Sequence, residues 1–150
     1  MSMTSAQPPE ASIPDTHVGI LDAAMLATVS TISHRDGLIS SNPVAFDWDG
    51  SHIRLSTLKS RVKYRNLLAN PQITFCAVDP KNVTRYVEIR GYAEISEDPG
   101  GELNSRLFRR MTGTEWPNLD EPGAERVIVK IVPTQVSAPA IYGGRLDRRA

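Results

Sequence analysis

Alternating apolar and polar residues recur along most of this chain and predict β-strands. Between residues 52 and 57, Ile53 and Leu55 share one face of an extended chain while their neighbours are polar. Residues 85–95 show the same period of two, and other short runs are rich in β-branched side chains. Together these patterns predict six strands, over residues 24–32, 38–47, 52–57, 72–78, 85–95 and 126–136.

Aspartate–glycine pairs lie between the first three predicted strands. Asp36–Gly37 and Asp49–Gly50 fit tight hairpin turns, because glycine accepts the positive φ that such turns require. Strands joined by a tight turn pair in antiparallel fashion. The sequence therefore predicts an antiparallel sheet.

A helical spacing interrupts the strands after residue 57. Tyr64, Leu67 and Leu68 stand at positions i, i+3 and i+4, which gives a helix one apolar stripe. Ser60 fits the N-cap, and Pro71 ends the helix because the residue before a proline is disfavoured in the helical conformation. Two further short helices are expected over residues 15–22 and 100–111, and a proline-rich loop over residues 116–123.

Six short strands with two or three short helices predict a mainly β protein built as an antiparallel β-barrel. Residues 1–14 are rich in serine and proline and are expected to form a disordered tail, which leaves residues 15–150 as one domain. The run from Val127 to Val132 is apolar on both strand faces, so one face would fill the barrel and the other would be buried against a second copy. The sequence thus predicts a homodimer.

Composition argues against several functional classes. Lys plus Arg and Asp plus Glu both number 17, so no net charge attracts nucleic acid or an anionic membrane. The single cysteine, Cys76, cannot form an intrachain disulfide and is expected to be a small buried side chain. No apolar stretch approaches the ~20 residues of a membrane span, and no signal peptide is recognisable, so a cytoplasmic protein is expected. The three histidines lack ligand spacing, which predicts no metal site.

Four cations lie within seven residues at the start of the helix predicted after residue 57. They are Lys59, Arg61, Lys63 and Arg65, and each is unfavourable there because the amino end of a helix carries partial positive charge. A bound anion would reverse that cost, using free backbone amides, nearby hydroxyls and the Arg61 guanidinium. The pattern predicts a phosphate site, with a solvated cationic helix face as the alternative. The sequence contains neither a Walker A loop nor a dinucleotide-binding glycine motif.

Several short motifs follow one another in a characteristic order and spacing. They are Ala27–Thr31, Asp36–Gly37 with Ser41–Val44, Leu55–Thr57, Arg61–Leu67, Asn70–Pro71 and Arg90–Gly91. Over about residues 18–136 this order resembles the split β-barrel flavin and deazaflavin oxidoreductases, the pyridoxamine-phosphate-oxidase-like superfamily. The resemblance implies an FMN-binding-like split barrel and a homodimer with its cofactor at the subunit interface.

The resemblance also implies roles for particular residues. By similarity, the backbone of residues 40–44 follows the flavin-like ring, Arg61 and Lys63 hold the cofactor phosphate, and Val78 and Tyr86 of the second subunit close the site. The residues expected at the cofactor are Ser40, Ser41, Asn42, Pro43, Val44, Ser56, Thr57, Leu58, Lys59, Arg61, Lys63, Val78 and Tyr86.

The carboxyl-terminal sequence narrows the activity that the resemblance implies. Residues 140–150 lack the segment rich in Arg, His and Trp with which true pyridoxamine-phosphate oxidases grip their substrate. The Arg61–Asn66 motif looks more like the branch that uses coenzyme F420, so hydride transfer from the reduced deazaflavin to a conjugated organic substrate is expected. The alternatives are FMN in place of coenzyme F420, a haem-binding protein, and a cofactor carrier or sensor without turnover.

Overall fold

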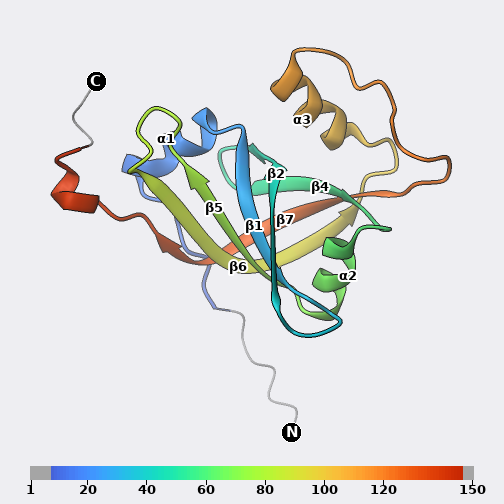
Figure 1. Ribbon diagram of the computed structural model, residues 1–150, viewed down its shortest axis with the longest axis horizontal. Coiled ribbons are helices and arrows are strands. Elements are labelled where there is room, and N and C mark those ends of the chain that lie inside the picture. Colours follow the sequence, from blue (N-terminus) through green and yellow to red (C-terminus); the bar gives the residue numbers. More distant parts are fainter. Residues whose placement is uncertain (1–7, 147–150) are drawn as a thin grey trace, which may run out of the picture.

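The computed structural model describes residues 8–146 and shows one curled antiparallel sheet (Figure 1). Within these residues the sheet has seven strands in the order β2-β1-β5-β6-β7-β4-β3. The strands are β1 (Leu26–Ile32), β2 (Ile39–Ala45), β3 (Asp47–Trp48), β4 (Ile53–Leu58), β5 (Gln72–Val78), β6 (Tyr86–Glu97) and β7 (Arg126–Ser137). The helices are α1 (Asp15–Ala23), α2 (Val62–Ala69), α3 (Glu102–Thr112) and the short 3-10 helix η1 (Ile141–Gly144).

The mainly β, antiparallel split-barrel fold is confirmed, but the described residues form seven strands rather than six. The strand predicted over residues 38–47 ends at Ala45, and a separate two-residue strand follows. The reason is that Phe46 and Asp47 are consecutive and both buried, at 1% and 9% exposure. A regular strand turns successive side chains to opposite faces, so the strand breaks at this point.

Alternate side chains of the long strands fill the barrel interior. Phe75 on β5, Val87 on β6 and Val129 on β7 are fully buried. Phe75 also packs edge-to-face on Phe46, with ring centroids 4.9 Å apart and ring planes at 86°. This packed core supports the strand ends and helices that form the candidate site.

The expectation that Cys76 is buried is wrong. The alternation that turns Phe75 inward turns Cys76 outward, between its cross-strand partners Thr28 of β1 and Glu88 of β6. The side chain is half-buried, and this burial raises the pKa of the thiol. A raised pKa keeps the thiol protonated at neutral pH, which argues against a nucleophilic role.

Helix α2 begins later than expected and is anchored by a buried asparagine. The helix starts at Val62, with no side-chain cap, so the predicted cap at Ser60 is wrong. The Asn66 side chain is fully buried, donates to Thr31 Oγ1 at 3.0 Å, and accepts from the backbone and ring nitrogens of His34 at 2.9 and 2.8 Å. These bonds fix α2 against β1 and against the turn that follows β1.

Gly91 lies at a β-bulge between β6 and β7. The pairing register shifts between Arg90 and Gly91. A Cβ atom at Gly91 would lie 1.9 Å from the carbonyl oxygen of Val132, so only glycine fits this backbone approach. The bulge increases the bend of the long strand and so contributes to the curl of the sheet.

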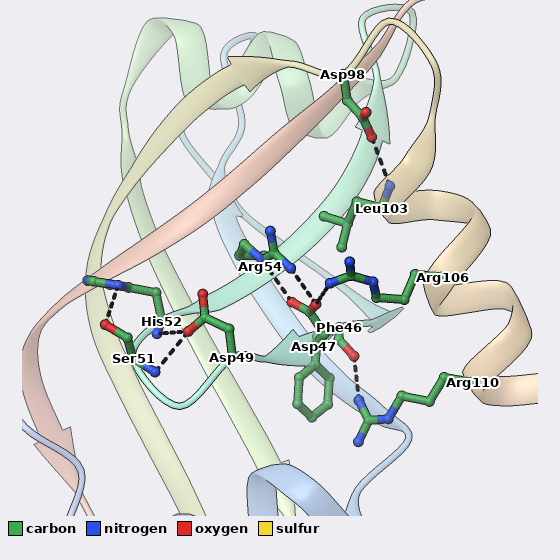
Figure 2. A network of polar contacts seen from close by, with 10 residues as sticks. All are labelled: Phe46, Asp47, Asp49, Ser51, His52, Arg54, Asp98, Leu103, Arg106 and Arg110. Carbon is green, nitrogen blue, oxygen red and sulfur yellow. Dashed lines mark hydrogen bonds and ion pairs between the residues drawn. The ribbon is translucent and has the colours of Figure 1, made fainter.

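Arginine contacts fix helix α3 to the sheet (Figure 2). Arg110 donates to the carbonyl of Phe46 at 2.6 Å, and its guanidinium lies 5.5 Å from the centre of the Phe46 ring. Asp47 accepts two hydrogen bonds from Arg54, at 2.7 and 3.1 Å, and pairs with Arg106 of α3 at 3.6 Å. The network holds α3 in one position over the edge of the sheet formed by β3 and β4.

Part of the expected amino-terminal tail contacts the barrel. The amide of Ala11 donates to the carbonyl of Pro133 at 2.8 Å, and Ile13 packs against the core. The barrel contacts thus begin before residue 15, while residues 1–7 lie outside the described part of the chain. No helix within residues 8–146 is long and apolar enough to cross a membrane.

Candidate cofactor site

A cavity of about 430 Å³ lies where the end of β4 passes into α2. We call it the cationic cavity. Seven of the predicted cofactor residues line it, together with three that were not predicted. The lining residues are Thr31, Ser40, Asn42, Ser56, Thr57, Leu58, Arg61, Val62, Lys63 and Arg126.

The amino terminus of α2 forms one wall of the cationic cavity. Arg61 occupies the N-cap position with an extended backbone, and no side chain accepts from the amides of the first turn. Such amides have no acceptor inside their own helix and carry the positive end of its dipole. The geometry therefore offers backbone donors to an anion in the cavity.

Two side-chain cations face the cavity without a carboxylate partner. Neither Arg61 nor Lys63 forms an ion pair with any of residues 8–146. Burial lowers the pKa of the Lys63 ammonium, and the neighbouring Arg61 charge lowers it further. The Arg61 charge acts on Asp120 only at longer range, where it helps to lower the pKa of that carboxyl. Positive charge outside any ion pair at a helix amino terminus is the arrangement that a phosphate would stabilise.

Arg126 is a third cation of this cavity that the sequence did not reveal. Its Nε and Nη2 atoms donate to the Asp120 carboxylate at 2.8 and 2.7 Å, and its Nη1 lies 3.4 Å from the Ser56 hydroxyl. The hydrogen bond from Arg126 lowers the pKa of the Asp120 carboxyl. Antiparallel pairing of β4 with β7 places Arg126 opposite Leu58, which is why so distant a residue reaches the cavity.

The predicted residue Lys59 does not line the cavity. Its ammonium contacts carboxylates from two other segments, Glu97 at 2.7 Å and Glu125 at 3.7 Å. The hydrogen bond to Glu97 raises the pKa of the Lys59 ammonium. The contiguous cationic cluster thus divides between an ion-pair network and the cavity.

The predicted segment 40–44 divides between two faces of β2. Ser40 and Asn42 line the cationic cavity. Ser41 and Pro43 have the opposite parity along the strand, and the Ser41 hydroxyl lies 2.7 Å from that of Ser30. Val44 has the same parity as Ser40 but lies further along, at a neighbouring groove.

That groove, of about 240 Å³, is mainly apolar and lies between the sheet and α3. We call it the α3 groove. Its lining residues are Val44, Ala45, Ser56, Asn104, Leu107, Phe108, Met111 and Trp116. Ser56 lines the cationic cavity as well, so the two spaces adjoin at this residue.

Val78 and Tyr86 do not line either space. They pair with each other across β5 and β6. Thr31 at the cationic cavity lies opposite Ile73, and Val78 is five residues further along β5, about 17 Å away at the rise of an antiparallel strand. Their expected contribution from a second subunit remains a prediction.

A larger cavity of about 670 Å³ shares Thr31 with the cationic cavity. The arginine that lines it, Arg90, is already paired with Glu88 at 2.9 Å. This space therefore lacks a cation outside any ion pair, the feature that marks the cationic cavity as the candidate phosphate site.

Residues 13–138 match the family model for pyridoxamine 5'-phosphate oxidase. The chain belongs to this family. Membership confirms the superfamily that the order of the sequence motifs indicated, a superfamily that includes oxidoreductases with flavin-type cofactors.

Several solved structures resemble this family member. A protein described as an F420 reductase is 32% identical with a TM-score of 0.74, and the match covers 83% of this chain and 98% of that one. A conserved hypothetical protein from Mycobacterium tuberculosis is 25% identical with a TM-score of 0.66, and 89% of each chain is covered. The General Stress Protein 26 from Bacillus anthracis, at 20% identity and a TM-score of 0.61, shares the fold over 80% of this chain and 88% of that one. No curated protein matches.

Proposed function

We propose that this family member is a reductase that uses coenzyme F420 and passes a hydride to a conjugated organic substrate. The cationic cavity carries the proposal, because it presents Arg61 and Lys63 without carboxylate partners beside free helix amides. Support for the deazaflavin comes from the 32% identity to a protein described as an F420 reductase. The cofactor identity goes beyond what family membership alone establishes.

The residues of the cationic cavity fit a phosphate group. Arg61 would supply a guanidinium fork and Lys63 a compact point charge, while Thr57 would add a hydroxyl. Charge-assisted hydrogen bonds of this kind are about twice as strong as neutral ones. Phosphate is recognised by donors and positive charge together, and this set offers both.

The strand beside the phosphate site would orient the ring. Ser40 and Asn42 line the cavity from one face of β2, and the ring would lie along this face up to Val44, which borders the α3 groove. When bound, the reduced deazaflavin supplies the hydride. The protein positions the two reactants and excludes water. Positioning of this kind can remove a large part of the activation barrier.

A second copy of the chain is part of the proposal. Leu26, Ile39 and Val78 are 53%, 73% and 45% exposed on the sheet face that points away from the core. Exposed apolar groups concentrated on one face favour association. We propose a homodimer in which this face is covered, and in which Val78 and Tyr86 of one copy approach the cofactor of the other.

A pair of binding titrations tests the proposal. Fluorescence of the full-length protein should report micromolar or tighter binding of coenzyme F420 and weaker binding of FMN. The opposite preference would assign the protein to FMN, and binding of neither would refute a flavin-type role. Oxidation of the reduced coenzyme in the presence of enones and quinones then separates a reductase from a carrier, because a carrier binds without turnover.

A further inference from the structure

One face of α3 is built as the wall of a ligand groove. Asn104, Leu107, Phe108 and Met111 stand at positions i, i+3, i+4 and i+7, which places them along one side of the helix. The opposite wall is formed by Val44 and its neighbours on the sheet. The α3 groove is therefore a space between helix α3 and the sheet.

Two aromatic rings give this groove a flat apolar wall. Trp116 packs edge-to-face on Phe108, with ring centroids 5.1 Å apart and planes at 73°. The Arg126 guanidinium lies 5.7 Å from the Trp116 ring centre, so the same arginine contacts the groove wall and lines the cationic cavity. A planar, electron-poor ring suits contact with aromatic faces and edges.

The groove also contains an amide without a partner. The Asn104 side chain makes no hydrogen bond to any other residue within 8–146, although it is half-buried. A half-buried side-chain amide with no partner in the protein can donate its N–H to a ligand bound in the groove. With Ser56 at the border with the cationic cavity, the polar groups of the groove are few and the rest is apolar.

The element that carries Asn104 is held rigidly. Asp98 caps α3 by accepting from the amides of Glu102 and Leu103 at 3.2 and 3.1 Å. Figure 2 shows Arg106 and Arg110 reaching from the same helix toward Asp47 and Phe46 of the sheet region. A ligand would thus meet a preformed wall, which lowers the entropic cost of binding.

We propose that the α3 groove binds the hydride acceptor, a flat conjugated carbonyl compound of one or two rings, with its oxygen at the Asn104 amide. The volume of about 240 Å³ corresponds to roughly eight water molecules at ~30 Å³ each, which suits one or two rings. This inference rests on the proposed function, because the acceptor needs a hydride from the reduced coenzyme at the adjoining cavity.

The proposed reaction balances without a further reactant except water. The hydride adds to the carbon conjugated with the carbonyl, and the displaced electron pair moves to the carbonyl oxygen, where Asn104 donates its hydrogen bond. A proton from water completes the two-electron reduction of the acceptor while the coenzyme is oxidised. Asn104 therefore has the role of stabilising negative charge at the acceptor oxygen.

Indole resonances provide a test that needs no turnover. The chain has two tryptophans, and only Trp116 lines the groove, while Trp48 packs against the core. In a ¹H–¹⁵N spectrum of the full chain, titration with 1-indanone should shift the Trp116 indole resonance saturably and leave that of Trp48 in place. No shift, or equal shifts of both, would overturn the proposal.

Variants make the test specific. Asn104→Leu should weaken 1-indanone binding about two- to tenfold, since one hydrogen bond is lost, but leave binding of the carbonyl-free indane unchanged. Met111→Trp should fill the groove and abolish both titrations, whereas the matched control Leu68→Trp, on the exposed side of α2, should not. Unaltered binding in Met111→Trp would contradict the site.

Two further observations separate the possible occupants. An indanone shift that persists in saturating coenzyme F420 supports distinct subsites, whereas its loss would assign the groove to the coenzyme ring and overturn the proposal. A Trp116 resonance that moves with protein concentration alone would assign the groove to a second copy and also overturn it. Failure to bind coenzyme F420 refutes the proposed function instead, and the indanone titration distinguishes the two failures.

Discussion

Replacement of Lys63 by methionine should separate cofactor binding from stability. Lys63 lies in the first turn of α2, half-buried, with Arg61 beside it and no carboxylate partner among residues 8–146. In the ligand-free protein its charge is therefore unfavourable. With a phosphate bound, the same charge becomes favourable.

The two effects have opposite signs and measurable sizes. Removal of a cation from the positive end of a helix should stabilise the free protein by about 0.3–1 kcal/mol, which corresponds to a rise in Tm of about 1–4 °C. Loss of a charge-assisted hydrogen bond to phosphate should cost about 1.5–3 kcal/mol of binding, or about 10- to 150-fold in Kd. The variant should thus be more stable and bind more weakly.

The pH dependence follows from the lowered pKa of Lys63. A lysine whose folded-state pKa lies below its unfolded value destabilises the fold while it is charged. This penalty is present below the folded pKa and disappears as pH rises above the unfolded value of about 10.4. The stability difference between Lys63→Met and wild type should therefore narrow toward high pH.

Thermal unfolding followed by circular dichroism, with a fluorescence titration of coenzyme F420, measures both quantities. Lys81→Met is the matched control, because Lys81 is exposed in the turn between β5 and β6, away from the cavity. A Lys63→Met variant that melts below wild type and binds with unchanged Kd would refute the reasoning.

Three further variants test the fold and site. Asn66→Ala should lower the free energy of unfolding by about 2–4 kcal/mol in urea denaturation, because buried hydrogen bonds lose a partner; a loss below 0.5 kcal/mol would contradict the anchor. Gly91→Ala should destabilise by about 2–3 kcal/mol in the same assay, since the new methyl meets the Val132 carbonyl; wild-type stability would argue against the bulge. Asp120→Asn should lower the free energy of unfolding at neutral pH, because the ionised Asp120 carboxylate, whose pKa is lowered by Arg126, stabilises the fold. The difference from wild type should shrink as pH falls below about 4, where the carboxylate becomes protonated. A constant difference across pH 2–7 would count against this ion pair.

The parts of the site that the sequence predicted are those formed by neighbours in the chain. Ser56, Thr57 and Leu58 end one strand, and Arg61 and Lys63 begin the next helix, so local patterns were enough to group them. The positions of most strands along the chain were predictable for the same reason. Hairpin turns and a period of two are local signals.

What the sequence could not show depends on strand pairing between distant segments. Arg126 reaches the cavity only because β7 pairs with β4, and Trp116 reaches the α3 groove only through the loop before β7. Lys59 looked like part of the phosphate cluster because Glu97 and Glu125 are far away in the chain. No local pattern identifies such partners.

The most direct test of the central claim compares coenzyme F420 with its phosphate-free deazaflavin chromophore. In fluorescence titrations, wild-type protein should bind the phosphate-bearing coenzyme more than tenfold more tightly, since phosphate contacts are worth about 1.5–3 kcal/mol each. In Arg61→Ala this preference should fall by about 10- to 150-fold, the worth of one such contact, while affinity for the chromophore stays unchanged. Equal affinity of wild-type protein for both molecules would contradict the assignment of the cationic cavity as the phosphate site.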